Sequence, residues 1–396
     1  MTDTVAQPAP DATQAWIDAA EALGPIIAKH KKALAVGPDL PPEIAQALEA
    51  AGLTRLWLPR SLGGAELSPV DYFRVMEVIA RHDGSVGWCA SIASTGTRAA
   101  GLIAESSVAE LLADGGFVSG SLSPAGKIVR EKDGWRINGR WPWGSFIVYS
   151  KVTLAVCVEY ENGMACTTQE GGPVLRAAML PTREVNILNT WDAGGLRSSG
   201  SHDFAIENVF VEDARTFALT DFNPKPHQQG ALYGLPFITM FALGITGVSL
   251  GIARGSIDAL TQLAQHKIAA GTQGPLREQA SVQGAVAQAE TALRSSRGFL
   301  FEAVQDLWER RVSGQPDDMK QRALVRMASC NVVDVAKKVA TKMFEAAGGS
   351  ALHEQSPFSA YLRDAQAAAQ HLAFSQRNME TAGRVLLGMT PGTHRF

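Results

Sequence analysis

The sequence has few features of the protein classes that are easiest to recognise. Its four cysteines form no CxxC pair and have no histidine at zinc-finger spacing, which argues against a disulfide scaffold and a structural zinc site. No run of about 18 uninterrupted apolar residues is present, and the first residues lack the regions of a signal peptide. The net charge of -3 gives no basic surface for nucleic acid or an anionic membrane. We therefore expect a cytoplasmic protein with no metal site and no nucleic-acid or membrane partner.

Sequence motifs of common nucleotide-binding and hydrolytic enzymes are also missing. The chain contains no Walker A loop, no GxGxxG after a strand, no HExxH and no GxSxG. Gly194-Gly195 is not followed by a helical pattern, so a Rossmann dinucleotide site is not predicted. No nicotinamide site is visible.

The 396 residues contain one β-rich segment between two helical ones. Residues 135–141 and 204–211 alternate apolar and polar side chains, the pattern of strands with one buried face. Between them, residues 190–201 are rich in glycine and serine, which indicates a loop whose backbone approaches another group closely. We therefore predict an N-terminal helical domain, a central β domain and a C-terminal helical bundle, with bounds at 1–116, 117–217 and 218–396.

Apolar residues recur at helical spacing on both sides of the β segment, and prolines and glycines mark where helices begin and end. Helices are expected at 12–35, 42–52, 70–81 and 85–103, and then at 232–265, 277–312, 316–347 and 357–387. The last four, joined by short breaks, predict an up-down four-helix bundle. Their apolar surface exceeds what one bundle would bury, which favours packing between subunits.

Two of these helices have an unusual composition. Segment 85–103 carries almost no charge and is expected to be buried, either in the core or as the wall of a binding cavity. Segment 232–265 carries Gly244, Gly247, Gly251 and Gly255 at intervals of three or four residues. Because glycine costs about 1 kcal/mol relative to alanine inside a helix, this spacing indicates close approach of another helix or of a ligand.

Three short stretches are candidates for chemistry. In the last helix, Asp364 and His371 are seven residues apart and would share a face, and the imidazole suits proton transfer. From the spacing alone, a capped or buried structural histidine and an Arg363–Asp364 ion pair are the simpler explanation. The Trp-Pro-Trp-Gly-Ser sequence at 141–145 suits stacking on a flat cofactor, or is a β-bulge with core tryptophans. Residues 120–126 offer backbone N–H groups and hydroxyls to a carbonyl-rich or phosphate ligand, or form an ordinary turn.

Taken in order, these segments resemble the acyl-CoA dehydrogenase superfamily, and more narrowly its flavin-dependent monooxygenase branch, the oxygenase components of two-component aromatic hydroxylases. The resemblance spans about 23–388 and is most specific at 138–145, 190–201 and 363–371. It implies a mainly helical α+β fold with a central barrel-like β domain, a flavin between that domain and the bundle, and homotetramers built as dimers of dimers.

The resemblance also implies which residues contact the flavin. The positions that match the family's motifs are Ser121, Leu122, Ser123, Trp143, Gly144, Ser145, Arg197, Ser199, Gly348 and Gly349. The first three would face the pyrimidine side, and the next three would flank the ring near N5 and C4a. The glycine pair would approach the phosphate tail, often from a neighbouring subunit. Relatives commonly have Ala-Ser-Gly at 144–146, where this chain has Gly-Ser-Phe, which affects the placement of Ser145 and the size of the pocket.

For the reaction, the resemblance implies a reduced-flavin-dependent monooxygenase. It would hydroxylate an aromatic or polycyclic small molecule, such as a phenol, an indole or a related heterocycle, through a C4a-(hydro)peroxyflavin formed from reduced FMN or FAD and O2. His371 matches the histidine of these oxygenases and would deprotonate the substrate or support the hydroperoxide, and Ser145 would hydrogen-bond N5 or the peroxide. A separate NAD(P)H flavin reductase would supply the reduced flavin.

Two alternatives stay open. An acyl-CoA dehydrogenase-type flavin dehydrogenase would need a carboxylate base, for which Glu354 is a candidate. A helical scaffold that no longer binds flavin is the other. Trp88, Phe146, Phe237 and Phe241 are candidate lining residues of the pocket, although each suits the core as well.

Overall fold

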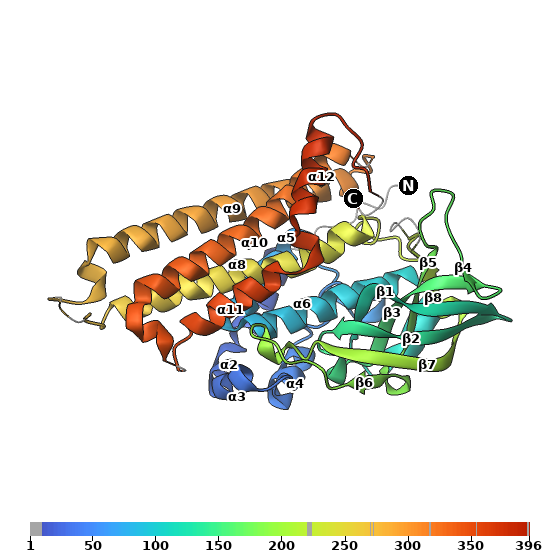
Figure 1. Ribbon diagram of the computed structural model, residues 1–396, viewed down its shortest axis with the longest axis horizontal. Coiled ribbons are helices and arrows are strands. Elements are labelled where there is room, and N and C mark those ends of the chain that lie inside the picture. The colour runs from blue at the N-terminus through green and yellow to red at the C-terminus, as the bar shows by residue number, and fades with distance from the viewer. Residues whose placement is uncertain are drawn as a thin grey trace.

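The computed structural model describes residues 10–219, 224–269, 271, 273–316, 318–353, 355–393 and 396. An eight-stranded mixed sheet lies at one end of a long group of helices, and the N-terminal helices pack beside both (Figure 1). The order of helices, sheet and helices predicted from the sequence is confirmed.

The N-terminal part consists of seven α-helices among the described residues. They are α1 (Pro10–Glu21), α2 (Gly24–Lys29), α3 (Lys31–Val36), α4 (Pro42–Ala50), α5 (Pro69–His82), α6 (Gly84–Arg98) and α7 (Glu105–Leu111). The single helix predicted at 12–35 is wrong, because Pro25 has no N–H to continue α1 and lies instead in the first turn of α2, where no such donor is needed. Helix α6 is buried along nearly its whole length, as its lack of charge predicts, and the chain continues after it as a short 3-10 helix, Ala99–Leu102.

The sheet forms from segments that are apolar on one or both faces. Its strands are β1 (Val118–Glu131), β2 (Gly134–Gly144), β3 (Val152–Glu161), β4 (Met164–Ala165), β5 (Leu175–Pro181), β6 (Asn186–Leu188), β7 (His202–Glu212) and β8 (Thr216–Ala218). Their order is β6-β7-β2-β1-β3-β5-β8, with β4 on β3; β1 and β3 are parallel and the other pairs antiparallel. The strands predicted at 135–141 and 204–211 lie in β2 and β7.

Both faces of strand β3 are buried, each in a different hydrophobic core. Its residues Ala155 and Cys157 belong to a core that β1, β2, β5 and β7 also line, whereas Leu154 and Val156 belong to a second core shared with α7 and the residues that follow α6. A strand that is buried on both faces reads as a nearly continuous apolar run, and 152–157 shows this with Thr153 as its one polar residue. The sheet is thereby fixed to the N-terminal helices.

The C-terminal bundle consists of α8 (Phe237–Ala264), α9 (Ala280–Val312), α10 (Met319–Ala347) and α11 (Phe358–Ala369), with α12 (Gln376–Leu386) packed against α10. The single helix predicted at 357–387 is wrong. The chain leaves α11 at Gln370 and forms a short 3-10 helix, Leu372–Phe374, before α12 begins. His371 is extended there (φ −63°, ψ 136°), so it is not on the face of a helix with Asp364.

The glycines of α8 allow neighbouring helices to come close. A Cβ atom on Gly247 would lie 2.9 Å from the Cβ of Met76, and one on Gly251 would lie 2.5 Å from the carbonyl oxygen of Glu77. The predicted close approach of another helix is therefore confirmed, with α5 as the partner. Helix α8 is also long and apolar enough to cross a membrane, but 78% of its most apolar window is buried inside the protein.

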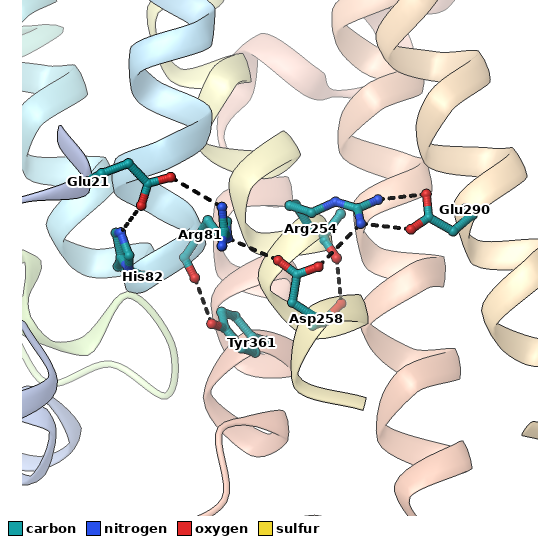
Figure 2. Close-up of polar contacts among 9 residues, drawn as sticks. Glu21, Arg81, His82, Arg254, Asp258, Glu290 and Tyr361 are labelled. Carbon is teal, nitrogen blue, oxygen red and sulfur yellow. Dashed lines mark hydrogen bonds and ion pairs between the residues drawn. The ribbon is translucent and has the colours of Figure 1, made fainter. Parts of the chain in front are cut away.

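A polar network ties α5 to the elements around it (Figure 2). Arg81 pairs with Glu21 of α1 (Nη1 to Oε1, 3.3 Å) and with Asp258 of α8 (Nε to Oδ2, 3.0 Å). The hydroxyl of Tyr361 in α11 donates to the carbonyl oxygen of Arg81 at 2.7 Å. The last turn of α5 thus holds α1, α8 and α11 together.

Candidate active site

His371 lies among three aromatic rings. The centroid of its imidazole is 6.0 Å from that of Trp88, 5.8 Å from that of Phe241 and 6.1 Å from that of Phe374. Burial in these apolar surroundings lowers the pKa of His371 to about 4, so the ring is neutral near pH 7.

The hydrogen bonds of His371 indicate which nitrogen carries the proton. The backbone N–H of Ala373 donates to Nδ1 at 3.2 Å, and Nε2 has no partner among the described residues. A neutral imidazole that accepts at Nδ1 carries its proton on Nε2, an assignment that rests on this hydrogen bond. The group that His371 offers to a ligand is therefore an N–H donor.

Trp88, which packs edge-on against His371, also forms a hydrogen bond with Ser145. Its hydroxyl accepts from Trp88 Nε1–H at 3.1 Å and lies 2.6 Å from the hydroxyl of Ser201, which lies 2.8 Å from that of Ser199. We call Ser145, Ser199 and Ser201 the serine cluster; all three are buried. The tertiary structure thus places the predicted residues His371 and Ser145 against one tryptophan, and Ser201 connects Ser145 to Ser199.

The four predicted lining residues have different places. Trp88 and Phe241 lie beside His371, as described above. Phe146 stacks on Phe117 in the main core with centroids 4.6 Å apart, and Phe237 packs edge-on against Phe217. The sequence gives no sign that Trp88 donates to Ser145, because the two residues are 57 positions apart.

The two tryptophans at the end of β2 have opposite environments. Trp141 is fully buried, stacks on Phe204 and donates to the carbonyl oxygen of Val156 at 2.6 Å. Trp143 is 66% exposed and has a positive φ of 64°, which is rare for a bulky residue, at a point where the register of β2 on β7 shifts. The alternative of a β-bulge with a core tryptophan is therefore confirmed for Trp141, and the indole of Trp143 is exposed next to Gly144 and Ser145.

The residues predicted at the pyrimidine side lie in a second irregularity of the sheet. The register of β1 on β3 shifts between Ser121 and Gly126, and the hydroxyl of Ser121 accepts from the backbone N–H of Ser123 at 3.2 Å. Leu122 packs against the core between the sheet and the N-terminal helices. The hydroxyl of Ser121 is thus engaged in the chain itself, while Leu122 and Ser123 are half-buried.

The 190–201 loop packs against α11 and the N-terminal helices. A Cβ atom on Gly195 would collide with the carbonyl oxygen of Arg363, which explains this glycine. Arg197 is half-exposed and its Nε–H donates to the carbonyl oxygen of Val36 at 3.3 Å. The backbone N–H of Leu196 donates to Asp364 Oδ1 at 2.7 Å. The Arg363–Asp364 ion pair predicted from the sequence is wrong, because Arg363 is exposed and its neighbour is buried against the loop.

Gly348 and Gly349 follow α10 and are exposed, with open space around both. Gly348 has a positive φ of 57°, which ends the helix. The turn between α10 and α11 lies at the end of the bundle remote from the sheet (Figure 1). Within one chain the glycine pair is therefore not beside Trp143 or Ser145. Glu354 lies outside the described residues.

Comparisons with known proteins give the family. The family models "Acyl-CoA dehydrogenase, N-terminal domain" and "Acyl-CoA dehydrogenase, C-terminal domain" match residues 18–107 and 243–376. The chain is 31% identical over 353 residues to indole-3-acetate monooxygenase of Pseudomonas putida, an alignment that covers 88% of this chain and 87% of that protein. The chain belongs to the acyl-CoA dehydrogenase family.

Within this family the chain is one of the flavin-dependent monooxygenases. It is 25% identical over 372 residues to the flavin-dependent monooxygenase, oxygenase subunit HsaA, of Mycobacterium tuberculosis strain H37Rv, covering 89% of this chain and 90% of that one. Among solved structures, XiaF from Streptomyces sp., in complex with FADH2 and glycerol, superimposes with a TM-score of 0.87 over 97% of each chain at 19% identity. HsaA is named as an oxygenase subunit, and a further relative is named as the oxygenase component of p-hydroxyphenylacetate 3-hydroxylase, so each of these relatives is one component of a larger system.

Proposed function

We propose that this chain is an oxygenase component that receives reduced FMN or FAD from a separate NAD(P)H flavin reductase and hydroxylates an aromatic or polycyclic small molecule, such as a phenol, an indole or a related heterocycle. The observation that supports this most is the neutral imidazole of His371 between the rings of Trp88, Phe241 and Phe374. Relatives named indole-3-acetate monooxygenase and p-hydroxyphenylacetate 3-hydroxylase act on aromatic compounds.

His371 would act first as a hydrogen-bond donor. Its Nε2–H is free to donate to a hydroxyl oxygen of the substrate or to an oxygen that becomes negatively charged during the reaction. To act as a base at Nε2, the ring would have to lose the hydrogen bond from Ala373 and change its tautomer. The three aromatic rings around it would exclude water and stack on a flat substrate.

The exposed indole of Trp143 suits the flat ring of a flavin, since it is an open aromatic surface next to Gly144 and the serine cluster. Leu122 and Ser123, in the bulge of β1 beside Ser121, would contact the pyrimidine side, and Arg197 would lie near the flavin or a subunit boundary. When bound, the reduced flavin supplies the activation of O2.

A homotetramer would complete the flavin site. Gly348 and Gly349 would approach the phosphate tail from a neighbouring subunit, because in their own chain they lie at the end of the bundle remote from the sheet. The side chains of Leu352, Leu372 and Leu387 are 75%, 67% and 80% exposed, which supports burial between subunits. A cytoplasmic location is part of the same proposal.

The test uses the purified chain, photoreduced FMN or FAD, and a panel of phenols and indoles mixed with oxygenated buffer. We expect hydroxylated product from the wild-type chain, and no NADH oxidation until a flavin reductase is added. His371→Asn should lower product yield about 100-fold and leave flavin affinity unchanged, because asparagine keeps an acceptor near Nδ1 but has no donor at the Nε2 position. His266→Asn, an exposed histidine at the end of α8, is the matched control.

Three results would contradict the proposal. NADH turnover by the chain alone would remove the need for a reductase. Oxidation of an acyl-CoA thioester with a dye as electron acceptor would identify a dehydrogenase. Full product yield from His371→Asn would exclude the imidazole from the reaction.

A further inference from the structure

The carboxyl group of Asp364 lies where three segments of the candidate site meet. Its Oδ1 accepts the backbone N–H of Leu196 at 2.7 Å, in the 190–201 loop. Its Oδ2 lies against the first turn of α6, where a Cβ atom on Gly84 would be only 2.6 Å away. Asp364 itself belongs to α11 and is 7% exposed. One buried side chain therefore touches the β domain, the N-terminal helices and the bundle.

Each of these segments leads within a few residues to a group of the candidate site. Four residues after Gly84, α6 carries Trp88. The loop continues from Leu196 to the serine cluster at 199 and 201. Helix α11 ends two residues before His371. A change in the Asp364 contacts would therefore alter the position of Trp88, of the serine cluster and of His371 relative to one another.

We propose that Asp364 is a positioning residue for oxygenation: its carboxyl group fixes the 190–201 loop and the start of α6 to α11, and so sets the distance between the imidazole of His371 and the serine cluster. This role rests on the function proposed above. Asp364 acts through Leu196 and Gly84 and has no contact with the imidazole itself in the structure.

We call the contacts of Asp364 with Leu196 and Gly84 the junction; a second carboxyl group makes it sensitive to pH. Asp83 caps the N-terminus of α6 by accepting the backbone N–H of Val86 at 3.1 Å. Burial, and then the charge of Asp83, raise the pKa of Asp364 to about 7, and burial raises the pKa of Asp83 as well. Among the described residues, the other charged or titratable groups that face the pair are Lys31 of α3, Cys89 of α6 and, on α11, Arg363 and Tyr361.

The direction of the pH effect follows from the raised pKa. The protonated form is favoured in the folded state, so the stabilisation is complete below the ordinary aspartate pKa and is lost as pH rises through about 7. Above that pH both carboxylates are charged, and their repulsion loosens the contact between α6, the loop and α11. The junction is therefore tighter at pH 6 than at pH 8.

The first test is hydrogen exchange of the Leu196 amide in the full chain, corrected for the intrinsic rate at each pH. We expect wild-type protection to fall between pH 6 and pH 8. Asp364→Asn, whose amide oxygen still accepts from Leu196, should keep the protection but lose its pH dependence. Asp364→Ala should lose at least about tenfold in protection. Asp334→Asn is the matched control, since this aspartate of α10 pairs with Lys338 rather than with the loop or α6, and its replacement should leave Leu196 unchanged.

The second test measures how much O2 ends in hydroxylated product and how much in hydrogen peroxide. Asp364→Ala should lower the product share several-fold at unchanged flavin affinity, and Asp364→Asn should restore most of it. Wild-type protection of Leu196 or normal product yield in Asp364→Ala would overturn the role of Asp364, as would an Asp364→Asn variant with the pH dependence of the wild type. Failure of the wild-type chain to hydroxylate any aromatic would instead overturn the proposed function, while the exchange data still report on the junction. Asp364→Asn keeps both tests decisive if Asp364→Ala does not fold.

Discussion

The burial of His371 should make the folded chain sensitive to acid. An ordinary histidine has a pKa near 6.5, whereas the apolar surroundings of this ring lower its pKa to about 4. At about 1.4 kcal/mol per pKa unit, the difference corresponds to about 3 kcal/mol, and the partial exposure of the ring reduces it to about 2 kcal/mol. Because the folded pKa is the lower one, the unfolded chain binds more protons between pH 6.5 and pH 4, and stability falls as the pH falls through that range.

The comparison that isolates this effect is wild type against His371→Asn. Asparagine does not titrate, so the variant should lose about 2 kcal/mol less stability than the wild type between pH 7 and pH 4.5 in urea unfolding. Asp83 and Asp364 titrate with the opposite sign, but they are present in both proteins and cancel in the difference. The difference in the free energy of unfolding between the two proteins at pH 7 measures any loss of packing in the variant, and it is subtracted from the difference at pH 4.5.

Nuclear magnetic resonance of labelled histidine side chains gives the same quantity directly. The chain has eight histidines, and the signal missing from His371→Asn identifies the ring in question. We expect it to stay neutral down to about pH 5. Titration of that signal between pH 6 and pH 7.5, or parallel loss of stability in wild type and variant, would refute the reasoning from burial.

Two further substitutions test contacts of the candidate site, one between Trp88 and Ser145 and one between the 190–201 loop and α11. Trp88→Phe removes the hydrogen-bond donor to Ser145, although the Ser145 hydroxyl keeps its contact with Ser201. We expect the free energy of unfolding to fall by about 1–2 kcal/mol and the share of O2 that ends in hydroxylated product to decrease. An unchanged product share would mean that this hydrogen bond does not position Ser145. Gly195→Ala places a Cβ atom against the backbone of α11 and should lower the free energy of unfolding by about 1–3 kcal/mol. Gly194 has open space around it, so Gly194→Ala should change that free energy by no more than about 0.5 kcal/mol. Equal effects would show that the loop moves away from α11 without cost.

Local sequence patterns determined most of the fold. Alternation at 135–141 and 204–211 identified β2 and β7, and helical periodicity identified α5, α9 and α10, because these signals depend on neighbours in the chain. The same reasoning failed at the two ends, where 12–35 forms three helices and 357–387 forms two. At the second break, the side chain of His371 accepts a backbone N–H, a local alternative to the helix that periodicity does not detect.

The sequence and its family resemblance singled out His371, Ser145 and the 190–201 loop, and the lack of charge in 85–103 indicated that this helix would be buried. Only the tertiary structure decided which of these residues contact one another. Trp88 reaches Ser145 across 57 positions, and Asp364 reaches Leu196 across 168, so neither contact leaves a periodic or local trace. Burial has the same origin: the residues that surround the imidazole and the aspartate, and so shift their pKa values, come from segments that meet only when the chain has folded.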